Sequence, residues 1–339
     1  MKWRSSASYP WLLGILSGGL LLLFVVSLAI GTVPIPLSDV FTTLMGGTPT
    51  KPTWSAIIWQ FRLPRSLTAM LAGSALAISG LQLQTLFHNP LAGPFVLGIS
   101  SGASLGVAIV VLASQQLGFL YGDINIITAA CIGAASVAVL VIVTARMVQS
   151  AIALLVLGLM FGYATGAVVN ILLQLSSAQQ VQQFVIWTFG SFGGVTWAQL
   201  PLMASGIAIG GAIAFITTTA LNVILLGDTQ ARSLGVSLNR LRFLVLLSSS
   251  ILAGVVTAFC GPIAFLGVAV PHLCRGVLQT SDVRWLLPSA TIVGAGLALV
   301  ADLLSQVLVR SSVLPLNSVT ALIGTPILIW VILRNQIRH

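Results

Sequence analysis

Ten apolar runs constrain this chain more than any other feature of its sequence. Most of them approach the roughly 20 residues that a helix needs to cross the hydrocarbon core of a bilayer. Only 6% of the 339 residues are charged, whereas soluble domains carry about 25%. The sequence therefore predicts an all-α membrane protein of about ten transmembrane helices, with residues 1–339 forming a single transmembrane domain. The expected spans are 11–31, 66–87, 95–113, 124–145, 151–173, 202–226, 243–259, 263–278, 286–309 and 317–333.

The basic residues give the orientation of these spans. Ten spans place both termini on one side of the membrane. Cytoplasmic loops carry an excess of Lys and Arg, and ten of the 14 basic residues lie on the side of the termini: Lys2, Arg4, Arg146, Arg232, Arg240, Arg242, Arg275, Arg284, Arg334 and Arg338. Only Lys51, Arg62, Arg65 and Arg310 fall outside. We therefore expect both termini in the cytoplasm, and we attribute the net charge of +9 to contact with anionic lipid rather than with nucleic acid.

The first run is expected to remain as a helix, because 11–31 exceeds the usual 7–15-residue core of a signal peptide. Two outside segments are also expected to contain short helices. Residues 32–64 allow one at Leu37 to Met45, and residues 174–199 read as a surface helix followed by a tight turn. Glycines repeat every fourth residue at 98–106 and 158–166, a spacing that lets helix backbones pack closely.

Residues 227–242, GDTQARSLGVSLNRLR, form a basic stretch between two apolar runs on the cytoplasmic side. Asp228 or Thr229 can cap a short helix with Ala231 and Leu234 on its apolar face. Gly235 can end that helix, and Ser237 can cap a second turn, which would give two short helices bent at the glycine. The pattern is typical of a rigid protrusion gripped by another protein; the alternative is a basic loop that only fixes topology. The only lysines are Lys2 and Lys51, and neither lies in a P-loop, so any ATP must bind to another subunit.

Two features suggest other functions. Residues Gly98 to Gly102 match G-x-S-x-G, which would make Ser100 the nucleophile and His272 the base of an intramembrane serine hydrolase, although the motif requires a strand–turn–helix. Asp302 lies well inside an apolar run and could serve a proton-coupled carrier. We favour helix packing for the first, and for the second a structural hydrogen-bonding role or a place on the wall of the solute path. Neither a catalytic centre nor a metal site is expected: His272 and Cys274 point to different helix faces, and the three cysteines are scattered.

Arginines open the second span on the outer face. Pro64 suits the first turn of a helix, and Arg62 and Arg65 beside it are expected to project outward. Together with Arg310, they could bind carboxylates of a soluble partner. The alternative is that they anchor the helix ends to lipid phosphates.

Five segments together resemble the FecCD family of ABC-transporter permeases, the membrane subunits of importers for iron–siderophores, haem and cobalamin. They are RLPRSLTAMLAGSALAISGLQLQTLFHNPLAGPFVLGISSGASLG from residue 62, GDTQARSLGVS, GPIAFLGVAVPHLCR, ADLLSQV and LPLNSVTALIGTPILIWVILRN. The resemblance runs from about residue 35 to 335 in family order. It implies the fold of a type II ABC importer permease in the inner membrane, moving an iron(III)-siderophore or similar large metal chelate by alternating access. Cobalamin and haem stay open as alternatives.

The resemblance also implies partners and site residues. Two ATPase subunits, which bind ATP and Mg, would grip the coupling helices at 227–242 through Asp228, Ala231, Arg232, Leu234 and Gly235. A second permease, identical or related, would complete the solute path, and a periplasmic or lipid-anchored binding protein would dock on Arg62, Arg65 and Arg310. An arginine commonly follows the Asp of the ninth span in this family; here Gln306 stands there and Arg310 lies about one turn later. The cytoplasmic gate would comprise Asn89, Pro90, Leu91, Gln149 and Ser150.

Overall fold

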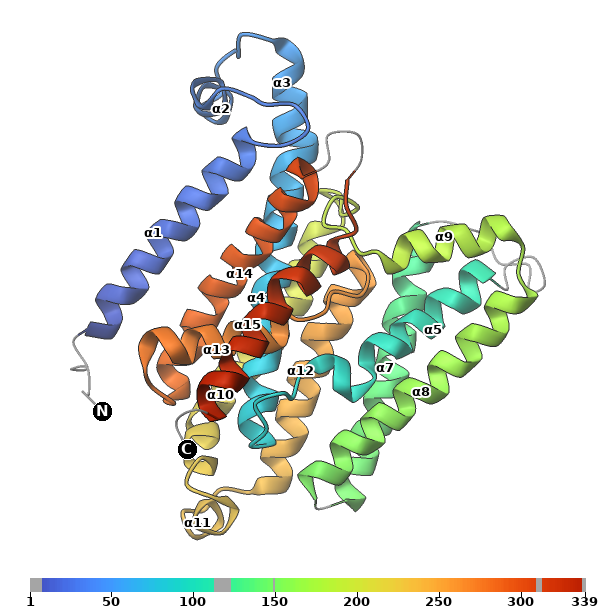
Figure 1. Cartoon of the computed structure of the whole chain (residues 1–339), viewed down its shortest axis with the longest axis vertical. Helices are drawn as coiled ribbons and strands as arrows, with labels where there is room; N and C mark the ends of the chain where they lie inside the picture. The colour runs from blue at the N-terminus through green and yellow to red at the C-terminus, as the bar shows by residue number, and fades with distance from the viewer. Residues whose placement is uncertain (1–7, 113–122, 149, 309–312, 337–339) are drawn as a thin grey trace.

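The chain is a bundle of long helices in a computed structural model that describes residues 8–112, 123–148, 150–308 and 313–336 (Figure 1). Across these residues every regular element is a helix. The long elements are α1 (Ser8–Ala29), α4 (Leu63–Leu86), α5 (Ile99–Leu112), α7 (Asp123–Met147), α8 (Ala151–Leu175), α10 (Leu200–Ile224), α12 (Leu238–Cys260), α13 (Leu266–Leu278), α14 (Val283–Val307) and α15 (Leu316–Gln336). The short ones are α2 (Leu37–Leu44), α3 (Pro52–Ala56), η1 (Ile57–Arg62), η2 (Pro94–Leu97), α9 (Ala178–Thr188) and α11 (Asp228–Ser233).

The ten predicted spans each correspond to a helix. In the described part of the chain, 7 helices are long and apolar enough to cross a membrane, and three shorter apolar helices complete the set at Ile99–Leu112, Leu266–Leu278 and Leu316–Trp330. The predicted helices in the outer segments are also present, as α2 and α9. A capping box begins α9: the Ser177 side chain accepts from the Gln180 backbone, and the Gln180 side chain accepts from the Ser177 backbone.

Helix α4 lies at the centre of the bundle and packs against α14, α12, α13 and α10. Glycines make two of these contacts close. A Cβ on Gly73 would overlap the carbonyl of Gly294 on α14, and one on Gly80 would overlap the carbonyl of Gly267 on α13. Backbone approach of this kind replaces the hydrophobic drive that lipid does not supply. These close contacts agree with the burial of the helices. The apolar part of the span that contains α4 is 78% buried inside the bundle, whereas that of α1, at the edge, is 17% buried.

A second group of helices, α5, α7, α8 and α9, lies to one side of α4 (right in Figure 1). Its predicted glycine packing is confirmed at most positions. Gly102 meets the backbone of Gly133 on α7, and Gly98 meets that of Gly158 on α8. Gly166 is the exception, because nothing lies within 4 Å of a Cβ placed there. The last glycine of that ridge therefore contributes no contact within the described structure.

The second span differs from its predicted start at residue 66. Helix continues from Pro52 through α3 and η1 into α4, a run of 35 residues. Residues 57–62 form a π-helical stretch directly before Pro64, which lies at the start of α4 and cannot donate a backbone hydrogen bond. A π-type insertion of this kind, often found at functional sites, absorbs the proline without breaking the helix.

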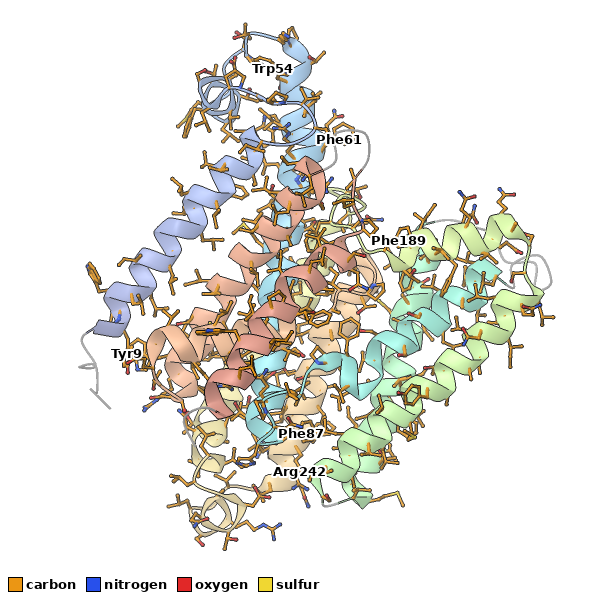
Figure 2. The ribbon with its side chains drawn as sticks, in the orientation of Figure 1. Tyr9, Trp54, Phe61, Phe87, Phe189 and Arg242 are labelled. Carbon is orange, nitrogen blue, oxygen red and sulfur yellow. The ribbon has the colours of Figure 1, made fainter. Side chains whose placement is uncertain are left out.

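The short elements mark two opposite ends of the molecule. Helices α2 and α3 lie at one end, and α11 lies at the other, toward which the start of α1 and the end of α15 both point (Figure 1). Trp54 and Phe61 lie at the first end, whereas Phe87 and Arg242 lie near the second (Figure 2). We call these the α2 end and the α11 end.

Candidate coupling, gating and docking sites

The protrusion at the α11 end, residues 227–242, consists of α11 and the first turn of α12; we call it the coupling hairpin. Glycines with left-handed backbones bound α11, with φ of +106° at Gly227 and +84° at Gly235. After Gly235 the chain folds back, since the Val236 amide donates to the Ala231 carbonyl at 3.0 Å. The predicted glycine stop is therefore confirmed.

Three predicted details of the hairpin are wrong. Gly227, rather than Asp228 or Thr229, is the N-cap of α11, and no side-chain hydrogen bond caps it. The second turn is no separate helix, because α12 runs unbroken from Leu238 to Cys260. Ala231 is fully buried, but Leu234 is 64% exposed and so does not share its face. Leu234 thus presents an apolar side chain at the surface, while Ala231 packs into the bundle.

Buried and charged contacts hold the hairpin to the bundle. Leu238 and Leu241, in the first turn of α12, are both buried. The Asp228 carboxylate lies 3.5 Å from the Arg242 guanidinium. Arg232 and Arg240 stay exposed. The result is a fixed, basic projection with one exposed leucine.

The predicted cytoplasmic gate falls at the α11 end too. The loop at 88–91 follows α4, and the Asn89 side chain accepts from the Leu91 amide at 2.9 Å. Leu91 is 49% exposed, and the Pro90 carbonyl accepts from His272 Nε2 at 2.7 Å. Ser150 caps α8 by accepting from the Ala153 amide. Gln149 lies outside the described residues.

The outer arginines do not project as predicted. Arg62 is only 8% exposed; its Nη1 donates to the Leu28 carbonyl at 2.6 Å, and its Nη2 donates to the Val33 carbonyl. Leu28 lies in the last turn of α1, where carbonyls lack helical partners. Arg62 therefore closes the end of α1 and is not available to a docking partner. Arg310 lies outside the described residues.

Arg65 forms an ion pair with Asp302 inside the bundle. Its Nη2 lies 2.8 Å from Asp302 Oδ1, and its Nε donates to both carboxylate oxygens at 2.9 and 3.0 Å. Gln306 Nε2 adds a third donor group at 2.8 Å from Oδ2. The Asp302 side chain is 4% exposed and that of Arg65 is 19% exposed. The predicted structural hydrogen-bonding role of Asp302 is confirmed by these contacts.

Ser100 belongs to helix packing, as favoured above. The 3-10 helix η2 precedes Ser100, and Gly98, with φ of +74°, lies between η2 and α5. A nucleophile elbow requires a strand before the serine, and here that position is occupied by a helix. The buried hydroxyl of Ser100 lies 3.2 Å from that of Thr257 on α12. His272, the base that a hydrolase would need, is bonded to Pro90 instead.

Sequence reasoning missed a set of polar side chains at the α11 end. Arg275 donates to Gln84 Oε1 at 2.5 Å. Asn222, in the last turn of α10, donates to Asp282 Oδ1 at 2.7 Å. Burial alone would raise the pKa of Asp282, but hydrogen bonds from Arg284 and Asn222 outweigh it and leave that pKa below its usual value. Two glutamines within the apolar run of α4, at 82 and 84, were the signal available in the sequence.

Known proteins resemble the chain over nearly its whole length. A sequence model of the FecCD transport family matches residues 19–334. The hemin transport system permease protein HmuU of Yersinia pestis is 38% identical over 321 residues, covering 94% of this chain and 95% of that protein. The vitamin B12 import system permease protein BtuC of Citrobacter koseri is 37% identical over 281 residues, covering 82% of this chain and 83% of that protein.

Solved structures agree on the fold. A metal-chelate type ABC transporter in an inward-facing conformation superposes with a TM-score of 0.85 at 27% identity, covering 96% of this chain and 99% of that one. The PsaBC structure from Streptococcus pneumoniae, at 16% identity and a TM-score of 0.54, shares the fold alone. The helices and their packing are thus those of a type II ABC importer permease. This chain belongs to the FecCD transport family of ABC-transporter membrane permeases.

Proposed function

We propose that the chain is the permease subunit of an ATP-driven importer in the inner membrane, with both termini in the cytoplasm. The coupling hairpin is the observation that carries this proposal. It is short, braced by buried Leu238 and Leu241, basic on its surface, and it exposes Leu234 at 64%. A projection with these properties suits a cleft on a soluble motor protein, because an exposed apolar side chain with basic residues near it in sequence matches the apolar core and polar rim of protein interfaces.

Partner subunits supply what the chain does not carry. Two ATPase subunits would bind ATP and Mg and hold one coupling hairpin each. A second permease, identical or closely related, would form the other wall of the solute path. ATP-driven closure of the two ATPases would change the angle between the coupling hairpins, and the bundle would pass that rotation to the gates at 88–91 and 149–150, giving alternating access.

The proposed solute is a large metal chelate. The relatives named above import hemin and vitamin B12, and the superposed transporter is of metal-chelate type. We infer an iron(III) chelate, and haem is the first to test because the hemin permease is similar along 95% of its length. An iron–siderophore and cobalamin are the competing solutes.

A periplasmic or lipid-anchored binding protein would deliver the solute at the α2 end. Arg65 keeps a docking role in this proposal because its side chain is 19% exposed while it is paired with Asp302, and Arg310 keeps one through the family resemblance. Arg62 does not, since it is buried against the end of α1.

Uptake by cells that express the chain with its ATPase and binding protein tests the solute. Labelled haem, a ferric siderophore and cobalamin are offered singly and in competition, and a Leu234→Glu variant serves as the uncoupled control. We expect saturable uptake of an iron chelate that falls to background in the Leu234→Glu cells. Uptake of none of the three chelates, or equal uptake in the variant, would refute the proposal.

A further inference from the structure

Two histidine side chains tie the 88–91 loop to neighbouring helices. His88 Nε2 lies 3.0 Å from the Ile224 carbonyl oxygen, and His272 Nε2 lies 2.7 Å from that of Pro90. A carbonyl oxygen only accepts hydrogen bonds, so each Nε2 must carry the proton and donate. The loop is thereby bonded both to α10 and to α13.

The bond from His88 reaches the point where α10 leads into the coupling hairpin. Ile224 is the last residue of α10, and its carbonyl also accepts from the Gly227 amide at 2.9 Å. Carbonyls in a final helical turn lack intrahelical partners, which makes this one available to His88. The same turn is bonded to the start of α14, because the Val283 amide donates to the Asn222 side chain at 2.7 Å.

The backbone at His88 has a conformation that is uncommon for a residue other than glycine. Its φ of +47° is in the left-handed region, which residues with a Cβ seldom adopt. The amide of Asn89 donates back to the Gln84 carbonyl at 3.2 Å, so His88 occupies the position that ends α4, where glycine is usual. A histidine here has a strained backbone, but unlike glycine it has a side chain that can reach α10.

Helix α13 holds the other side of the same segment. Gln84, in the last turn of α4, donates to the Val268 carbonyl at 3.1 Å and accepts from Arg275. His272 lies on the same helix, between these two contacts in sequence. The end of α4 and the loop after it are therefore fixed to α13 at three points, and only His88 connects the loop to α10 among the hydrogen bonds of the described residues.

We propose that His88 and His272 are positioning residues that make the 88–91 loop follow the coupling hairpin. His88 transmits displacement of the hairpin from Ile224 to the loop, and His272 keeps Pro90 against α13 so that the loop moves as a unit instead of deforming. This inference rests on the proposed function, in which the hairpin receives the ATPase stroke and the loop gates the solute path.

Reporter cysteines on the assembled complex in nanodiscs test it. Leu91→Cys reports the loop, and Thr229→Cys, at an exposed position on α11, reports the hairpin. A hydrophilic maleimide measures the reaction rate of each with and without ATP, and the chain without a reporter gives the background from its native cysteines. His→Gln variants place an amide nitrogen near the position of Nε2, whereas His→Asn variants place one near Nδ1, too far back to reach the carbonyl.

In the parent we expect ATP to change the rate at both reporters. With His88→Ala the rate at Leu91→Cys without ATP should rise about two- to tenfold, the equivalent of one lost hydrogen bond, and its response to ATP should disappear. The response at Thr229→Cys should remain. His88→Gln should restore the loop response and His88→Asn should not, and the His272 series should behave in the same way.

The outcomes separate this inference from the proposed function. If both reporters still respond to ATP in His88→Ala and His272→Ala, the histidines transmit nothing and the inference is overturned. If Thr229→Cys ignores ATP in the parent complex, the hairpin is not driven, and the proposed function fails together with the inference. Because His88→Gln preserves the hydrogen bond, a general folding defect in the alanine variants cannot be mistaken for support.

Discussion

Removing either partner of the Arg65–Asp302 ion pair should destabilise the bundle by unequal amounts. Loss of one partner from a buried pair costs about 3–5 kcal/mol, because the other charge is left without compensation. The Asp302 side chain is 4% exposed, so Arg65→Leu strands a carboxylate that, within the described part of the chain, keeps only Gln306 as a side-chain donor. Arg65 is 19% exposed and can turn toward solvent, so Asp302→Leu should cost less than Arg65→Leu.

The double variant gives the sharper test. Replacing both partners by leucine removes the stranded charge, so the Arg65→Leu, Asp302→Leu chain should be more stable than Arg65→Leu alone. Thermal unfolding in detergent ranks the stabilities of the parent chain, the two single variants and the double variant. Arg284→Leu serves as the matched control, since its ion pair with Asp282 is 71% exposed on the arginine side and its loss should lower the melting temperature far less than Arg65→Leu does. Additive losses in the double variant would refute the argument, because they would mean that the two side chains do not interact.

Three further predictions concern packing, the hairpin and pH. Gly80→Val should cost about 3 kcal/mol of unfolding free energy, because its Cβ would overlap the backbone of α13; Gly166→Val, with nothing within 4 Å, should cost far less in the same melt. Leu234→Glu should leave the melting temperature unchanged and abolish co-purification of the ATPase, whereas Ala231→Glu should lower the melting temperature, since only Ala231 is buried; equal melting temperatures would contradict this. Asp282, whose pKa lies below its usual value because hydrogen bonds outweigh burial, should contribute stability in full above about pH 4 and lose it as the pH falls through its lowered folded-state pKa. Melts at decreasing pH should therefore lose less stability in Asp282→Asn than in the parent, and parallel curves would count against it.

The transmembrane helices could be predicted from the sequence because hydropathy alone specifies them. Every expected span has a helix, including the short ones at α5 and α13. The surface helix expected within residues 174–199 is present as α9, and the capping box of Ser177 and Gln180 that begins it is a further local signal in the sequence. Such features depend on residues within a few positions of one another.

The contacts of charged residues could not be predicted, because their partners are distant in sequence. Arg62 donates to a carbonyl 34 residues away, and Arg65 pairs with a carboxylate 237 residues away. A charge beside a proline at the predicted start of a span is typical of an exposed helix end. In the structure the helix begins earlier and continues through η1, so both arginines lie within the helix and not at its end. The positive φ at His88 is likewise invisible in a sequence that has no glycine there.

ATP-dependent transport in vesicles tests the central claim, that this chain is a passive gate moved through the coupling hairpin by a motor on another subunit. With the binding protein that delivers the chelate present throughout, purified chain is reconstituted without an ATPase, with its ATPase, and with an ATPase unable to hydrolyse ATP, and accumulation of the chelate against its gradient is measured. The account predicts accumulation only with the active ATPase and ATP, and its loss in the Leu234→Glu chain. Accumulation by the chain alone, driven by a proton gradient or by nothing added, would contradict it.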